Sequence, residues 1–425
     1  MSHTVPGYGR RVQTIVYRNG ATGLRPITPA SAQTLERAAE KALSPAAWAY
    51  IAGSSGTEWT TAANRAALDR WQIVPRMLRD VSHRDLSIEL FGHRYDTPVL
   101  AAPVGVLELA HKNGDLEAAR ACAELRVPFV FSNQASVPME DTAAATGDAP
   151  HWFQLYWSSS DDLVASLVRR AEASGAQAIV VTLDTHMLGW RPRDLDLAYL
   201  PFIHGMGIAQ YTSDPVFREL VRKRASQPAG PRPKVTRAAI RTLIDMTRRY
   251  PGRFRDNLRS AEPRAAVETF LDVFSRSSLT WPDLAFVREH TDLPIVVKGL
   301  QHPDDAEKAL DAGVDGIIVS NHGGRQLDGA IGSAAALPDI VDRIAGRVPV
   351  LFDSGIRTGS DVLKALALGA SAVLVGRPYV YGLAIGGAAG AREVLRNIIA
   401  EFDLALGLSG HTSVAELNRD ILAAA

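Results

Sequence analysis

Three segments of the chain share one pattern, and this repetition limits the possible folds more than any other feature. In each segment a helix end leads through a glycine into a short aliphatic run, at 173–182, 311–320 and 367–376. A glycine at this place is typical of a helix C-cap, and an unbroken β-branched run is typical of a strand buried on both faces. The pattern therefore predicts parallel β/α units.

Further short apolar runs occur at the spacing that such units require. Together with the three repeats they give eight predicted strands, at 99–102, 127–131, 152–155, 179–182, 295–297, 316–319, 348–352 and 372–375. Plausible helices such as 303–311 and 359–368 separate most of these strands. Eight parallel β/α units close into a ring, so we predict an α/β fold of the TIM (β/α)8 barrel type.

The barrel is expected to occupy residues 96–400, with a segment on either side. Residues 1–95 are interpreted as an N-terminal extension, with a helix over 31–43 and a hairpin over 86–95 that could plug the barrel floor. Residues 401–425 are predicted to form a C-terminal helical tail.

Residues 186–290, between the fourth and fifth strands, are too numerous for an ordinary βα loop. They are interpreted as a lid, a partner surface or a partly disordered segment. The part from 218 to 259 is rich in arginine and lysine, and the apolar residues between Ala239 and Met246 fall at helical spacing. This helix either packs one apolar stripe on the barrel or meets an anionic membrane surface or acidic partner.

The composition argues against several classes of protein. The chain has 46 basic and 46 acidic residues, so its charge gives no reason to expect a nucleic-acid partner. Cys122 is the single cysteine, which excludes an internal disulfide, and no histidine pair has metal-ligand spacing, so we expect no metal. The start of the chain lacks an apolar signal core and no run is long enough to span a bilayer. We therefore expect a cytoplasmic protein without a membrane partner.

Chemically reactive or polar residues stand at the ends of most predicted strands. They are Ser132, Gln154, Tyr156, Thr182, Asp184, Lys298, Ser320, His322, Asp353, Arg357, Gly376 and Arg377. In a barrel these residues converge on the C-terminal face, where catalysis takes place in this fold. A few of them could be simple helix caps, but the placement of the whole set predicts an active site.

The segment 320–329, Ser-Asn-His-Gly-Gly-Arg-Gln-Leu-Asp-Gly, carries the most specific chemistry. A histidine accepts a proton near neutral pH, an arginine binds a carboxylate in a fixed fork, and paired glycines let the backbone approach a flat ligand. His322 is the natural base, and Asp184 is the natural group to orient it. Alternatively, His322 is a loop histidine and Asp184 an N-cap. We favour proton chemistry on a carboxylic acid.

Two further features indicate a flavin with a phosphate tail. The loops after the last two strands are the usual phosphate site of a TIM barrel, and Arg357 and Arg377 would supply positive charge there. Lys298 ends a buried strand, where a cation needs a partner. A reduced flavin would provide one, whereas a Schiff-base lysine is the competing interpretation. A Schiff-base aldolase has no use for two carboxylate-binding arginines, so we favour the flavin.

The sequence 297–299, the segment 317–328, and the strand ends 353–357 and 376–378 together resemble the FMN-dependent L-2-hydroxy acid oxidases and dehydrogenases. The resemblance runs from about residue 50 to residue 422. The long insertion and the segment 188–196 are most similar to the lactate 2-monooxygenase branch of that family.

The resemblance implies a role for each matching residue. Arg325 and Arg191 would hold the substrate carboxylate, Tyr50 and Tyr156 would bond its carboxylate and hydroxyl, and His322 would be the base paired with Asp184. The residues implied for the flavin ring or ribityl chain are Gln154, Thr182, Ser132, Lys298 and Ser320. Those implied for the ribityl chain and phosphate are Asp353, Ser354, Gly355, Arg357, Gly376 and Arg377. The loop after the first strand, Ala102, Pro103, Val104 and Gly105, would lie beside the flavin.

Two positions depart from the family pattern. Gln134 stands where glycolate oxidase has a tryptophan over the substrate, which makes the pocket more polar. Gly105 stands where the family often has alanine, and the missing methyl leaves room for dioxygen or peroxide beside the flavin. This second departure is consistent with a monooxygenase.

The expected function is FMN-dependent oxidation of a small, lactate-like L-2-hydroxy acid with dioxygen. In the monooxygenase branch the products would be acetate, carbon dioxide and water. The alternatives are an oxidase that yields keto acid and hydrogen peroxide, a dehydrogenase linked to a quinone, and an FMN-binding scaffold without catalysis. The α-hydrogen would leave either as hydride or as a proton taken first by His322. The resemblance also implies a homotetramer or octamer.

Overall fold

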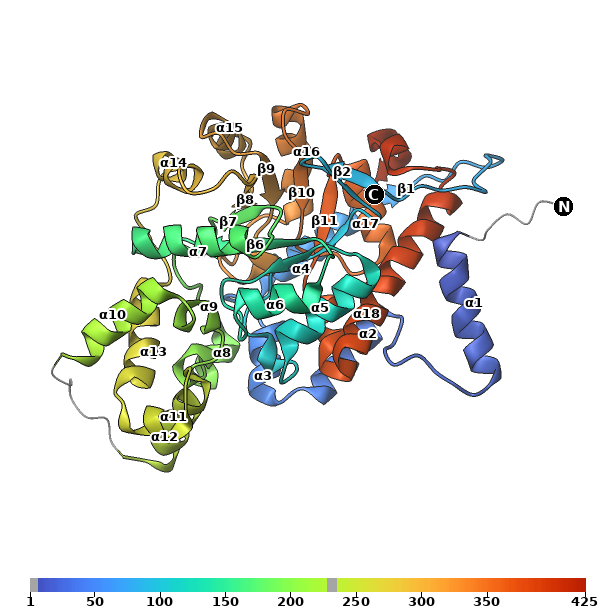
Figure 1. Ribbon diagram of the computed structural model, residues 1–425. Coiled ribbons are helices and arrows are strands. Elements are labelled where there is room, and N and C mark those ends of the chain that lie inside the picture. Colours follow the sequence, from blue (N-terminus) through green and yellow to red (C-terminus); the bar gives the residue numbers. More distant parts are fainter. Residues whose placement is uncertain (1–6, 228–234) are drawn as a thin grey trace.

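Eight parallel strands form a closed barrel in the computed structural model, which describes residues 7–227 and 235–425 (Figure 1). The strands are β4 (Val99–Ala101), β5 (Phe129–Phe131), β6 (His151–Tyr156), β7 (Ile179–Thr182), β8 (Ile295–Leu300), β9 (Gly316–Val319), β10 (Val350–Phe352) and β11 (Ala372–Val375). Strand β11 pairs with β4 and closes the ring. The predicted TIM barrel and all eight of its strands are confirmed.

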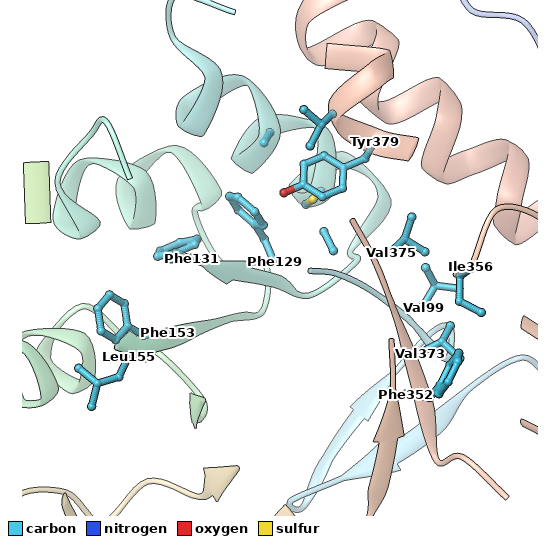
Figure 2. Close-up of a cluster of buried hydrophobic side chains, with 14 of the residues drawn as sticks. Val99, Phe129, Phe131, Phe153, Leu155, Phe352, Ile356, Val373, Val375 and Tyr379 are labelled. Atoms are coloured by element: carbon cyan, nitrogen blue, oxygen red, sulfur yellow. The ribbon is translucent and has the colours of Figure 1, made fainter. Parts of the chain in front are cut away.

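Alternate residues of each strand belong to two separate hydrophobic cores. Residues such as Phe129, Phe131 and Val375 point outward and pack against the surrounding helices, with Tyr379 lying over Phe129 (Figure 2). Residues such as Val130 belong to a second cluster that fills the barrel interior. Because both faces of each strand are buried, the strands read as unbroken apolar runs in the sequence.

A helix follows each barrel strand on the outside of the ring. In chain order these helices are α5 (Gly114–Leu125), α6 (Met139–Thr146), α7 (Asp161–Ala173), α14 (Leu284–Arg288), α15 (Pro303–Asp311), α16 (Ser333–Ile344), α17 (Gly359–Ala367) and α18 (Arg377–Leu408). Helix α14 follows β7 only after the long insertion. Each strand therefore delivers its C-terminal end to the same face of the barrel.

The hairpin expected near residues 86–95 is formed by β2 (Ile88–Leu90) and β3 (His93–Tyr95). Its turn residues, Phe91 and Gly92, both have positive φ angles, as a two-residue type I′ turn requires. Leu90 and Tyr95 belong to the inner barrel cluster, and the Phe91 ring lies 5.6 Å from that of Trp152. The hairpin therefore packs against the interior of the barrel.

The rest of the N-terminal region is helical. It contains α1 (Tyr8–Ala21), α2 (Ala32–Ala42), α3 (Pro45–Ala52) and α4 (Trp59–Asp69). Helices α1 and α2 pack along the long helix α18 (Figure 1). The predicted helix over 31–43 corresponds to α2. Helix α3 carries Tyr50 toward the C-terminal face of the barrel, where Tyr50 lines the cleft described below.

The C-terminal segment differs from the predicted helical tail over 401–425. Helix α18 runs without a boundary through residue 400 and ends at Leu408, after which Gly410 adopts a φ of +84° that does not continue a helix. Beyond it lie two 3-10 turns, η5 (Val414–Glu416) and η6 (Arg419–Ile421). The last strand, β12 (Leu422–Ala424), pairs antiparallel with β1 (Trp71–Ile73). The prediction of a helix is wrong for residues 409–425, because pairing with a distant strand decides their conformation.

The insertion between β7 and α14 is built from short helices at the lower left of Figure 1. Its elements are α8 (Pro192–Asp196), η2 (Pro201–His204), α9 (Ala209–Thr212), α10 (Pro215–Ala225), α11 (Arg237–Arg249), α12 (Phe254–Arg259), α13 (Glu262–Val273) and η3 (Trp281–Asp283). The helix expected around Ala239–Met246 is α11, which packs mainly on α12, α13 and η2 rather than on the barrel. Part of the basic segment 218–259, residues 228–234, lies outside the described residues.

Helix α11 leaves part of its apolar stripe in contact with solvent. Ile240 is 49% exposed and Leu243 is 46% exposed. Arg249, at the end of the same helix, donates to Glu108 of the barrel over 3.1 Å. Within residues 7–227 and 235–425, none of the helices combines the length and apolar character that crossing a bilayer would require.

Candidate active site

The C-terminal ends of the barrel strands surround a cleft with about 1100 Å³ of empty space, including its open mouth. The predicted site residues that line it are Tyr50, Ala102, Pro103, Val104, Gly105, Gln134, Tyr156, Arg191, Lys298, His322, Arg325, Asp353, Ser354, Gly355, Arg357, Gly376 and Arg377. The other five, Ser132, Gln154, Thr182, Asp184 and Ser320, are not among the lining residues.

His322 and Asp184 form the tightest polar pair of the cleft. Nδ1 of His322 lies 2.6 Å from Oδ1 of Asp184, so this nitrogen donates and Nε2 remains to face a ligand. His322 holds a φ of +58°, a strained conformation for a residue other than glycine and one often found at functional positions. The hydroxyl of Thr185 donates to the same Asp184 oxygen over 3.0 Å, a contact that no sequence pattern indicates.

The charges around this pair set its protonation state. Burial lowers the pKa of His322, and although Asp184 opposes this, the pKa stays below its ordinary value. Burial alone would raise the pKa of Asp184, but His322 and Lys298 together hold it well below its ordinary value. Asp184 is therefore ionised and His322 neutral at pH 7, which is the state that a general base requires.

Two arginines lie together in the wall of the cleft. Nε of Arg191 donates to the backbone oxygen of Arg325 over 3.1 Å, and the Arg325 guanidinium lies 5.1 Å from the centre of the Tyr50 ring. Burial and the neighbouring charge of Arg191 lower the pKa of Arg325 to about 9. Two neighbouring cations, of which Arg191 is buried and Arg325 partly buried, favour the binding of an anion such as a carboxylate.

Lys298 is the buried cation at the centre of the site, with a side chain that is 4% exposed. Its ammonium group donates to Ser320 over 2.9 Å and lies 3.4 Å from Asp353 and 3.7 Å from Asp184. Burial would lower the pKa of Lys298, but the two carboxylates raise it above its ordinary value. The side chain is therefore charged, and it is held in place from three directions.

The polar groups beneath the cleft fit a flavin. Oε1 of Gln154 accepts from the hydroxyl of Ser132, whereas Nε2 of Gln154 and the hydroxyl of Thr182 are buried without a protein partner among the described residues. Buried polar atoms are normally paired, and the ring of a flavin offers both donors and acceptors. Together with the charged Lys298, these groups suit FMN, whose ring edge gains negative charge on reduction.

The phosphate end of such a cofactor would meet the loops after β10 and β11. Helix α18 begins at Arg377 directly after β11, so its first backbone N–H groups face this end of the cleft. Burial lowers the pKa of Arg357, whose side chain also lines the cleft. Arg377 turns its guanidinium toward the backbone oxygens of Gly323 and Gly53, at 2.9 and 3.0 Å. Arg357 donates to the backbone oxygen of Ile356 over 2.9 Å, so both arginines bond to backbone oxygens while lining the cleft. The donor set fits a phosphate.

Gly105 and Gln134 face each other at the cleft wall. A methyl group on Gly105 would lie 3.0 Å from Cβ of Gln134, which is tighter than an ordinary contact. The space predicted beside Gly105 is therefore bounded by Gln134. In the described part of the chain no cluster of histidine, cysteine and acidic residues is placed to hold a metal ion.

The insertion supplies part of the cleft wall, through apolar residues that the sequence did not single out. Leu188, Phe202 and Phe274 line the cleft, and the Phe202 ring lies 6.5 Å from that of Tyr50. Their spacing in the sequence carries no signal, because it depends on the path of an irregular helical segment. Thr185 and Ile51 are further lining residues that were not predicted.

A barrel with a buried lysine, a histidine–carboxylate pair and an arginine pair at this face is the architecture of a flavin-dependent oxidoreductase acting on carboxylic acids. Residues 39–424 match the family of FMN-dependent dehydrogenases. An FMN-dependent alpha-hydroxy acid dehydrogenase from Penicillium citrinum is 42% identical, with 96% of this chain and 94% of that protein covered. The L-lactate oxidase of Lysinibacillus sphaericus is 41% identical over 90% of both chains.

Solved structures agree with these relatives. A crystal structure of mandelate oxidase with (S)-4-hydroxymandelic acid superposes with a TM-score of 0.76 at 38% identity, covering 93% of this chain and 98% of that one. The chain therefore belongs to the FMN-dependent dehydrogenase family, as an FMN-dependent oxidoreductase of 2-hydroxy acids.

Proposed function

We propose that this protein oxidises a small L-2-hydroxy acid such as L-lactate with dioxygen, and that it releases acetate, carbon dioxide and water in the manner of a lactate 2-monooxygenase. This outcome rests mainly on how closely the insertion packs beside Gly105. Leu188 and Phe202 line the cleft, and Gly207 packs so closely that an added Cβ would lie 2.6 Å from Val106 and 3.0 Å from Gln134. Apolar insertion residues in the cleft wall favour retention of the keto acid for a second step.

Substrate binding follows from the charges of the cleft. Arg191 and Arg325 would bind the carboxylate, and the hydroxyls of Tyr50 and Tyr156 would contact the carboxylate and the α-hydroxyl. Phe202 and Gln134 both line the cleft, and their bulk beside the substrate position favours a short side chain on the substrate. The preference between a methyl group and a larger group is part of the proposal.

The proton is handled by His322 and its neighbours. Nε2 of His322 takes the proton that leaves the substrate, and Asp184 stabilises the imidazolium that forms. The hydroxyl of Tyr156 lies 3.4 Å from Nε2 and so marks where the substrate hydroxyl would sit. Bound FMN would supply the acceptor for the two electrons released at the α-carbon, with dioxygen as the final oxidant. Lys298 supplies the positive charge that the reduced cofactor requires.

Analysis of the product tests the proposal. The acid formed from L-lactate in air is identified by chromatography with catalase present, so that free peroxide cannot decarboxylate pyruvate. Acetate is the expected product. Pyruvate would instead assign the protein to the oxidases, an outcome favoured by its similarity to the L-lactate oxidase. Absence of both acids would rule out lactate and direct the search to larger hydroxy acids.

The setting of the reaction is also part of the proposal. The single cysteine, Cys122, is buried, which suits a reducing compartment such as the cytoplasm. We propose a homotetramer or octamer in that compartment, by analogy with the family resemblance. Size-exclusion chromatography with light scattering measures the assembly directly.

A further inference from the structure

Gln326 uses both polar atoms of its side chain on one neighbouring loop. It lies directly after Arg325, and its partners all belong to residues 184–191, which follow strand β7. Its Nε2 donates to the backbone oxygens of Asp184 and Met187 over 2.9 and 3.0 Å. Its Oε1 accepts from the backbone N–H of Gly189 and from Nη2 of Arg191 over 3.3 and 3.1 Å.

These bonds join the two halves of the catalytic machinery. One end of the amide fixes the backbone of Asp184, whose carboxylate orients His322. The other end fixes the guanidinium of Arg191, whose Nε is already held by the backbone oxygen of Arg325. Nη2 and Nε of Arg191 are thus both engaged, and the residue lines the cleft.

The segment that carries Gln326 is itself rigidly held. Asp328, two residues further on, accepts from the backbone N–H groups of Thr57 and Thr60 over 2.7 and 3.1 Å. Arg325, on the other side, donates to the backbone oxygen of Gly53 over 2.6 Å. The backbone around Gln326 is therefore fixed, and the side chain of Gln326 holds the loop 184–191 in place.

We propose that Gln326 is a positioning residue that holds Arg191 in the orientation needed to bind the substrate carboxylate. This inference rests on the proposed function, because it assigns Arg191 to a carboxylic acid substrate. A primary amide is the side chain that combines two donors with an acceptor at this length. Glutamate would lose both donors and would place a competing carboxylate on Arg191. Methionine would keep the approximate volume and lose all four bonds.

The test compares Gln326→Met with Leu327→Ala, a control on the same segment whose side chain is 70% exposed. Binding of oxalate to the FMN-loaded protein is followed by the change in flavin absorbance, which does not depend on turnover. We expect Gln326→Met to weaken oxalate binding by roughly 10- to 100-fold, the loss of one to two charge-assisted hydrogen bonds. FMN content and melting temperature should stay near those of the wild type, and Leu327→Ala should bind normally.

A double-mutant cycle separates positioning from a general structural effect. If Gln326 acts through Arg191, Gln326→Met should add less than about threefold once Arg191→Met is present. The inference would be overturned if the two effects multiply in the double variant, or if Gln326→Met binds oxalate within twofold of the wild type. Should Gln326→Met fail to fold, Gln326→Leu serves instead, with the same expected loss of oxalate binding.

The proposed function can fail separately from this inference. If no L-2-hydroxy acid reduces the wild-type flavin, the proposed substrate class is wrong. If oxalate binding still depends on Gln326 through Arg191 in that case, the positioning role stands. Normal reduction of the wild type with unchanged binding in the Gln326 variants would refute the positioning role alone.

Discussion

Replacing Asp184 with asparagine should slow reduction of the flavin by about 10²- to 10⁴-fold. Asp184 lies 2.6 Å from His322, and both groups are largely buried. The imidazolium that forms on His322 during the reaction would be attracted to Asp184 by about 6 kcal/mol at this distance and an effective dielectric constant of about 20, which sets an upper bound. Removing one partner of a buried pair typically costs about 3–5 kcal/mol, and each 1.36 kcal/mol corresponds to a factor of ten in rate.

The pH dependence gives this prediction a second signature. Asp184 raises the pKa of His322 against the effect of burial. Without that charge the imidazolium is less stable, so the pKa of His322 falls further. The acidic limb of the residual rate should therefore move to lower pH in Asp184→Asn.

The assay is anaerobic stopped-flow reduction of bound FMN by L-lactate between pH 5 and pH 9. Asp196→Asn provides the control, because Asp196 is exposed on the same insertion and bonds to no part of the cleft. A reduction rate within threefold of the wild type, with an unchanged pH profile, would refute the role assigned to Asp184.

Two further substitutions test other parts of the site and fold. Arg325→Lys keeps the charge but loses the planar fork, so we expect KM for the hydroxy acid to rise by roughly 10- to 100-fold with a smaller change in kcat, measured by steady-state oxygen uptake. Burial raises the pKa of Asp115 to about 7. Between about pH 4 and pH 7 this carboxyl is therefore mostly protonated in the folded protein and mostly ionised in the unfolded protein. Stability therefore falls as pH rises through this window, and Asp115→Asn should raise the melting temperature relative to the wild type more at pH 8 than at pH 4. An equal difference at both values would contradict this.

The barrel could be predicted because its signals are local. Each strand is a short apolar run, and three of them follow a glycine that ends a helix, as at Gly313 with a φ of +76°. Residues at strand ends meet at one face by the geometry of the fold, so the sequence alone predicts that His322, Lys298 and Asp184 lie together. Because each strand is packed on both faces, the observed positions of these residues could differ little from the predicted ones.

The features that could not be predicted from the sequence depend on contacts between distant residues. Strand β12 forms because Leu422 pairs with Ile73, and a three-residue segment carries too little pattern to reveal this. Phe202 reaches the cleft only because the insertion folds on its own helices. Gln326 looks like an ordinary polar residue in the sequence, and its four partners become visible only when the loop after β7 is placed.

The central claim is that His322 drives electron transfer from an L-2-hydroxy acid to bound FMN. It is tested most directly by mixing the FMN-loaded protein with L-lactate, or with a panel of L-2-hydroxy acids, in the absence of oxygen. We predict that the wild type loses its flavin absorbance, whereas His322→Ala retains FMN but stays oxidised. A wild type that no member of the panel bleaches, or a His322→Ala variant that bleaches at the normal rate, would contradict the account.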